Sequence, residues 1–164
     1  MKTTCSALIA LITLNLPLLQ SCGEKNEGLP DTLHTDGYNE TEMDEAMANA
    51  RGSIAVFQQV LASGTGENHA VKVAIEDGDD TEHFWLVDVS EIEGGFRGTL
   101  NNEPGIVSNV SLGDEVDAIG DAISDWMYIH ENQMHGNYTL RVLLPNMEGE
   151  EAEFYRSKLA PLPN

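Results

Sequence analysis

The chain has 164 residues, of which 41% are hydrophobic and 22% are charged. This length and composition suit one domain with one hydrophobic core. The 28 acidic residues outnumber the eight basic ones and give a formal net charge of -20, which argues against nucleic-acid binding because phosphates would be repelled. The charge favours a well-solvated surface and, as an alternative, a protein partner that is basic.

Residues 1–21 have the pattern of a bacterial lipoprotein signal peptide. Lys2 provides a positive start, and the uncharged apolar run after it is too short to span a bilayer. The run ends in Leu-Gln-Ser-Cys at residues 19–22, which resembles the lipobox at which a cysteine receives lipid. We therefore expect cleavage before Cys22 and lipidation at Cys22. An ordinary secretory signal with a chance cysteine, or a buried apolar helix, is the alternative.

Lipidation at Cys22 would place the protein in the bacterial cell envelope. The residue after it is Gly23 and not an aspartate, which favours the outer membrane, with the domain facing the periplasm. Cys5 would leave with the signal, so the mature chain would have no thiol for a disulfide, a nucleophile or a metal site. Residues 22–40 have the Gly, Asn, Asp and Glu content of a flexible tether, and residues 41–164 would then form a single domain.

Residues 41–63 have the pattern of the main helix. Thr41 and Asp44 form a variant of the capping box, and apolar residues recur at spacings of three and four on one face. Gly64 is a natural stop after this pattern. The apolar stripe consists of Met47, Ala50, Ile54, Phe57 and Leu61.

The chain after Gly64 has the pattern of an antiparallel sheet. Residues 70–76 alternate in character, the pair Asp77-Gly78 predicts a tight hairpin, and residues 83–89 are strongly β-prone on both faces, as in a central strand. The later strands expected are residues 95–101, a short edge piece at 106–112, residues 116–119, and residues 123–130 with a turn at 131–133.

The C-terminal third adds helical signals. Residues 137–144 fit either a short helix or a strand, and we favour the helix. Residues 148–158 are acidic first and basic last, an order that suits a terminal helix. The sequence thus predicts an α+β fold: a bent antiparallel sheet or small partial β-barrel with one main N-terminal helix and a short C-terminal helix.

Seven residues have side chains that suit a ligand or partner site. No spacing among them fits a metal or cofactor site, so we expect neither. Trp85 and Trp126 are also expected in the core, and Asp125 could accept a backbone N–H group in a turn. The candidates are His83, Trp85, Asp125, Trp126, His130, His135 and Tyr138.

Several sequence blocks resemble the YegJ-type family of bacterial domains of unknown function. The resemblance covers residues 44–144, and the stretch Ile-Ser-Asp-Trp-Met-Tyr at residues 123–128 is its most specific part. The other blocks are Val71-Lys72-Val73, Glu82-His83-x-Trp85, residues 113–116 and residues 136–141. This family implies a compact α+β domain. It has no assigned activity, so no catalytic residue can be transferred from it.

Three functions remain open on the sequence. The first, which we favour, is a non-enzymatic envelope lipoprotein that reaches the membrane through its lipid anchor and binds a partner or supports a complex. The second is an immunity-type inhibitor whose acidic surface covers a basic toxin. The third is a hydrolase that uses Asp125, His130 and His135.

Overall fold

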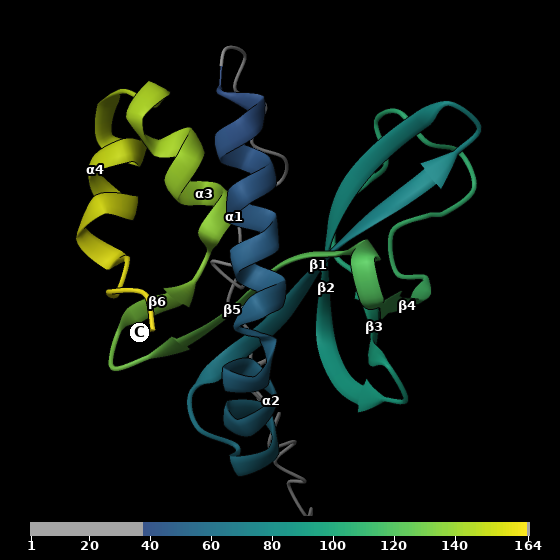
Figure 1. Cartoon of the computed structure of the whole chain (residues 1–164), viewed down its shortest axis with the longest axis horizontal. Helices are drawn as coiled ribbons and strands as arrows, with labels where there is room; N and C mark the ends of the chain where they lie inside the picture. The colour runs from purple at the N-terminus through teal and green to yellow at the C-terminus, as the bar shows by residue number, and fades with distance from the viewer. Residues whose placement is uncertain (1–37, 164) are drawn as a thin grey trace, which may run out of the picture.

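The computed structural model describes residues 38–163, which form a six-stranded antiparallel sheet with helices packed on it (Figure 1). The predicted signal peptide, Cys22 and most of the predicted tether lie outside these residues. The sheet is bent and not closed, and the predicted α+β class is confirmed. The strands are β1 (Glu67–Asp77), β2 (Asp80–Ile92), β3 (Gly95–Leu100), β4 (Glu115–Ile119), β5 (Ile123–His130) and β6 (Gln133–Gly136).

The strand order is β4-β3-β2-β1-β5-β6. The first half of β1 pairs with β5 and its second half pairs with β2. Register shifts interrupt both the β1–β5 and the β2–β3 ladders, and Asp88 in β2 has a φ of 51°. Such bulges bend strands. The sheet therefore extends to both sides of the long N-terminal helix, with β3 and β4 on one side and β6 on the other (Figure 1).

The region predicted as one main helix forms two, α1 (Glu40–Gly52) and α2 (Ile54–Ser63). The predicted cap at Thr41 is also wrong. The side chain of Asn39 accepts the backbone N–H groups of Thr41 at 3.0 Å and Glu42 at 3.4 Å, and asparagine is a strong N-cap residue. The helix thus begins inside the segment predicted as tether. Gly64, with a φ of 66°, ends α2 as predicted.

The break between α1 and α2 at Ser53 has a tertiary cause. The indole N–H of Trp126 donates to the carbonyl of Ala50 at 3.0 Å and to Oγ of Ser53 at 3.2 Å. In an uninterrupted helix the Ala50 carbonyl would accept from the N–H of Ile54. A side chain that inserts into this ladder kinks a helix. The break therefore depends on a residue of β5 that is distant in sequence.

The sheet carries a hydrophobic cluster on each face, because side chains alternate along a strand. Helices α1 and α2 pack against the first face. The second face packs against α3 (Tyr138–Leu143), η2 (Leu144–Asn146) and α4 (Gly149–Lys158). The first face presents Val71, Val73, Phe84, Leu86 and Trp126. The second face presents Ala70, Trp85, Val87, Met127 and Ile129.

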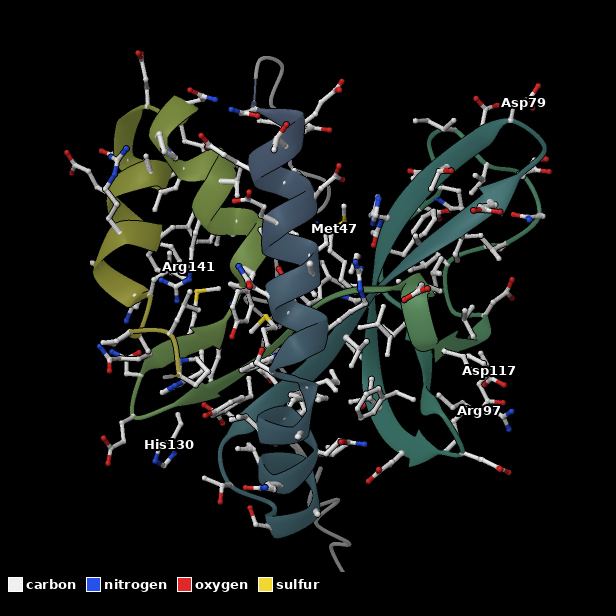
Figure 2. The ribbon with its side chains drawn as sticks, in the orientation of Figure 1. Met47, Asp79, Arg97, Asp117, His130 and Arg141 are labelled. Carbon is white, nitrogen blue, oxygen red and sulfur yellow. The ribbon has the colours of Figure 1, made fainter. Side chains whose placement is uncertain are left out.

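The C-terminal elements agree with the predicted helices. Arg141 of α3 donates to the carbonyls of Gly136 at 3.2 Å and Ala160 at 2.6 Å, and Figure 2 shows it between α3 and the β5–β6 hairpin. The N–H of Ala160 also donates to the carbonyl of Met134 at 3.0 Å. These bonds hold the chain after α4 against β6. No helix in residues 38–163 has the length and apolar character needed to cross a bilayer.

Residues 106–112, expected as an edge strand, form no strand. They belong to a long loop between β3 and β4 that is held by carboxylates of the β1–β2 hairpin. Glu82 accepts the N–H groups of residues 105–107 at 2.9–3.1 Å, and Asp77 accepts the N–H and hydroxyl of Ser108 at 2.9 and 2.7 Å. Backbone N–H groups need acceptors, and here two acidic side chains provide what a neighbouring strand would.

Both predicted hairpin turns are confirmed. Asp77 pairs with Asp80 across the first turn, where Gly78 has a φ of 68°, and Figure 2 shows Asp79 at the tip. In the second turn Glu131 and Asn132 both have positive φ values, of 51° and 61°. Two successive residues with positive φ match the right-handed twist of the strands that they join.

Candidate functional site

A cluster of polar side chains lies on the second face of the sheet, where β1, β2 and β5 run side by side. Its centre is Lys72 in β1, which has Trp85 of β2 and Asp125 of β5 as its two cross-strand neighbours. We call the whole set the polar cluster. It consists of Lys72, His83, Trp85, Ser124, Asp125 and Thr139.

Asp125 is fully buried and caps a helix from a distant strand. One carboxylate oxygen accepts the N–H groups of Trp126 at 2.8 Å and Tyr138 at 3.1 Å. The other accepts the N–H of Thr139 at 2.8 Å and its hydroxyl at 2.7 Å. The first N–H groups of a helix have no partner within the helix. Asp125 satisfies two of them in α3, so the predicted role as an acceptor for backbone N–H groups is confirmed.

Burial shifts the pKa values of Asp125 and Lys72, and the charge of each residue acts against the shift in the other. Burial raises the pKa of Asp125, and the bonds from Thr139 and the charge of Lys72 act against this rise. Burial lowers the pKa of Lys72, and the charge of Asp125 acts in the opposite direction. Lys72 Nζ lies 3.4 Å from Oγ1 of Thr139, so Thr139 bridges the two charged groups. The arrangement keeps a buried carboxylate and a half-buried amine close together.

His83 and Ser124 form a pair at the edge of the polar cluster. Nδ1 of His83 lies 2.9 Å from Oγ of the buried Ser124. The β1–β5 register shift makes Ser124 an extra residue in β5. His83 lies in β2, and the strand between them, β1, has the small residue Ala74 opposite His83. Desolvation, and secondly the charge of Lys72, lower the pKa of His83 to about 4, although part of the side chain remains exposed. His83 is therefore a neutral imidazole near neutral pH.

Trp85 does not lie in the core as expected. It is half-buried, and Lys72 Nζ lies 5.5 Å from the centroid of its ring. Its backbone is held by the next loop, since the N–H of Asn101 donates to the Trp85 carbonyl at 3.0 Å. Trp85 lies at the margin of the second-face cluster, next to Val87, which is also half-buried. The second face therefore leaves part of a large aromatic ring in solvent.

Trp126 and Tyr138 belong to the opposite face. The side chain of Trp126 is 1% exposed, as predicted, and packs against Phe57 with ring centroids 5.7 Å apart. Tyr138 meets the Trp126 ring edge-on at 5.7 Å. Both rings are core residues of the first face. They take no part in the polar cluster, although each is adjacent in sequence to a residue that does.

His130 and His135 lie at the end of the β5–β6 hairpin, where Figure 2 shows His130. Their ring centroids are 6.3 Å apart, and His135 stacks on Tyr128 with centroids 4.6 Å apart. The pKa of His135 is lowered, and burial is the main cause. Within residues 38–163, the side chain of Asp125 bonds to the β5 backbone and to α3, and to neither histidine. The fold does not assemble Asp125, His130 and His135 into one site.

The polar cluster thus contains three predicted candidates, namely His83, Trp85 and Asp125, and three residues that sequence reasoning did not select. These are Lys72, Ser124 and Thr139. Lys72 had a visible signal, because it is the single charged residue in the otherwise apolar run of residues 70–75 and lies between two valines. Ser124 and Thr139 had none, since their partners are 41 and 14 residues away. The described residues contain no group of three or more His, Cys, Asp or Glu side chains that could hold a metal ion.

The acidic surface is not neutralised by the basic residues. Four of the 28 acidic and two of the eight basic residues precede residue 38, which leaves 24 acidic and six basic side chains in the described part. There, Arg97 is the one Lys or Arg in an ion pair, with Asp117 at 2.6 Å (Figure 2). Lys158 donates to Asn132, and Lys72 belongs to the polar cluster. The remaining three, which donate to backbone carbonyls, are Arg51, Arg141 and Arg156.

Comparison with known proteins gives a family without an assigned activity. Residues 40–160 match the model of a family described as "Uncharacterized protein conserved in bacteria (DUF2314)". An uncharacterized protein of Escherichia coli K12, YegJ, is 39% identical over 149 residues, which cover 91% of this chain and 96% of that protein. A protein of Neisseria meningitidis serogroup B that is named as an ankyrin repeat protein is 38% identical over 76 residues, 46% of this chain and 30% of that protein. No solved structure matches the chain significantly.

Proposed function

The chain belongs to the DUF2314 family of uncharacterized bacterial proteins, and within that family we propose that it is a lipid-anchored binding protein of the cell envelope. Its partner presents a basic surface. The protein acts without catalysis, as an accessory or inhibitory subunit that holds this partner at the membrane.

The proposal rests on the hydrogen-bond partners of the basic side chains, most of which are not carboxylates. Five of the six Lys and Arg side chains in residues 38–163 are directed to backbone carbonyls, to an amide or to the polar cluster, and one pairs with a carboxylate. Most of the 24 carboxylates of this region therefore have no cation beside them. A surface of this kind attracts a basic partner and accelerates its association.

The positions of the candidate residues also favour binding over catalysis. Asp125 caps α3, Trp126 packs in the core, and Ser124 is buried against His83. A nucleophile needs an approach for its substrate and a base oriented by a third group. In the described part of the chain, the buried Ser124 lacks the first, and Asp125 is bonded away from the histidines.

The anchor is tested by lipid labelling of the full chain. We expect the wild-type protein to incorporate a radioactive fatty acid and to start at Cys22 after processing. Cys22→Ser should block both, because the apolar run of the predicted signal peptide has no other cysteine at its end. An unlabelled wild-type protein, or a mature amino terminus at another residue, would show that the envelope anchor is wrong.

The partner is tested by capture from bacterial envelope extracts with the lipidated protein. We expect a specific protein of basic isoelectric point whose purified form binds in dilute buffer, and whose affinity falls at least tenfold between about 50 mM and about 500 mM salt. A captured partner that is acidic, or one whose affinity does not change with salt, would contradict the charge-based mode of binding.

A further inference from the structure

Lys72 has unused hydrogen-bonding capacity in a half-buried position. Its ammonium has three N–H donors, and the one hydrogen-bond acceptor found for it in residues 38–163 is Oγ1 of Thr139, at the long distance of 3.4 Å. The nearby carboxylate of Asp125 already accepts four bonds from other groups. Asp125 therefore balances the charge of Lys72 without accepting a bond from it. A half-buried ammonium in this state favours an additional acceptor.

The neighbours of Lys72 on the same face supply an apolar surface and a second polar group. Trp85 lies directly across the ladder from Lys72, and Val87 lies two residues further along β2. Both side chains are half-buried, so they expose apolar area beside the ammonium. His83 lies two residues before Trp85, and its Nδ1 is held by Ser124. Its other ring nitrogen, Nε2, is free of that bond and can donate when it carries the proton.

We propose that Lys72, His83 and Trp85 form a binding site for a small molecule that carries a carboxylate on a planar apolar body. The carboxylate accepts from Lys72 Nζ and His83 Nε2, and the apolar body packs on Trp85 and Val87. This site is separate from the acidic surface, and it does not depend on the partner proposed above.

The negative net charge of the protein restricts the places at which a small carboxylate can bind. A small anion is repelled by most of the surface, so it is retained only where a cationic group offers unused donors at hydrogen-bond distance. Lys72 is such a place, while Arg97, the exposed arginine of β3, is already paired with Asp117. A bound carboxylate would also reverse the effect of burial, because a negative charge raises the pKa of both Lys72 and His83. A rise in the pKa of His83 when a carboxylate is added is therefore a measurable sign of binding, which a cluster with a purely structural role would not produce.

The site is tested by titrating the protein with benzoate while NMR monitors the tryptophan indole and histidine ring signals. The sample is the folded chain from residue 22 onward, with Cys22 replaced by Ser. We expect saturable shifts at Trp85 and His83 but not at the buried Trp126, together with a rise in the pKa of His83. Benzamide, which has the ring without the charge, and acetate, which has the charge without the ring, should each bind roughly tenfold more weakly. Equal binding of benzamide, or no saturable shift with benzoate, would overturn the proposal.

Variants locate the effect. Lys72→Gln should weaken benzoate binding roughly tenfold or more, since it removes a charged hydrogen-bond donor, and Lys72→Arg should retain part of it. Lys158→Gln is the matched control, because Lys158 lies 5.9 Å from the centroid of Phe154 in a similar pair whose aromatic ring is exposed. Benzoate binding that survives Lys72→Gln, or that is lost in Lys158→Gln, contradicts the site. If Lys72→Gln does not fold, the rise in the His83 pKa in the wild-type protein still decides the question.

Discussion

The two tryptophans lie on opposite faces of the same sheet, and their surroundings differ in kind. Trp126 is 1% exposed, lies among aromatic rings under α1 and α2, and donates its indole N–H to the Ala50 carbonyl. Trp85 is half-buried beside a lysine, at the margin of the cluster that α3, η2 and α4 cover. The first face is sealed by apolar contact, and the second face is only partly covered.

With the binding site proposed above, this difference assigns stability to the first face and binding to the second face of one sheet. Buried aromatic rings contribute mainly through the area that they remove from water. The second face keeps its polar groups in place through Asp125, which links β5 to α3, and it leaves apolar and basic groups accessible together. A ligand that gains from both kinds of group would bind the second face, and the first face offers it nothing.

The largest effect is expected for Trp126→Ala. Removal of this ring leaves a cavity in the first-face cluster and takes one of its hydrogen bonds from the Ala50 carbonyl, so the free energy of unfolding should fall by about 3–5 kcal/mol. Trp85→Ala should cost about 1–2 kcal/mol, because part of its ring is already in solvent. Urea unfolding followed by circular dichroism gives both values. Equal losses for the two variants would remove the contrast between the faces.

A smaller but still large effect is expected for Asp125→Asn. The amide would point donor hydrogens at N–H groups that now bond to a carboxylate, so the free energy of unfolding should fall by about 2–4 kcal/mol. Thr139→Val is the control, since it removes only the hydroxyl, with its short bond to Asp125 and its long bond to Lys72, and should cost about 1 kcal/mol. Hydrogen exchange of the first amides of α3 should accelerate in Asp125→Asn. Unchanged exchange there would mean that Asp125 does not hold this helix.

The smallest effect is a pH dependence at His83. Its pKa of about 4 in the folded protein lies below the 6.5 of an ordinary histidine, so the unfolded chain binds the proton more readily. Stability from this residue is complete above pH 6.5 and is lost as the pH falls towards 4. The loss should be about 1 kcal/mol, because the partly exposed ring is screened by solvent. The free energy of unfolding of His83→Gln, measured across this range, should depend less on pH than that of the wild type. Identical slopes would contradict the shift.

Local signals predicted most elements correctly and failed where a distant partner intervened. The hairpins at residues 77–80 and 131–133, and the helix at 137–144, follow from turn residues and local patterns, and all are confirmed. The split between α1 and α2 was missed because it depends on the indole of Trp126. The predicted strand at 106–112 is a loop because Glu82 and Asp77 accept its N–H groups from a neighbouring hairpin.

The polar cluster shows the same limit for the candidate site. Trp85, His83 and Asp125 were identifiable by side-chain type, but their common location was not. Lys72 is brought between Trp85 and Asp125 by the register of three strands, and the extra residue in β5 brings Ser124 to His83. Register is set by cross-strand packing over the whole sheet, so no local pattern contains it.

The sequence by itself determined the fold class, the hairpin turns, the end of the N-terminal helical region at Gly64 and the strongly negative net charge, because these depend on neighbouring residues or on composition. Only the tertiary structure decided that Asp125 caps α3, that Trp85 is half-exposed while Trp126 is buried, and that Lys72 has unused donors. These properties arise from groups far apart in the chain. Each depends on which residues the bent sheet brings opposite one another, and on how much of each face the helices cover.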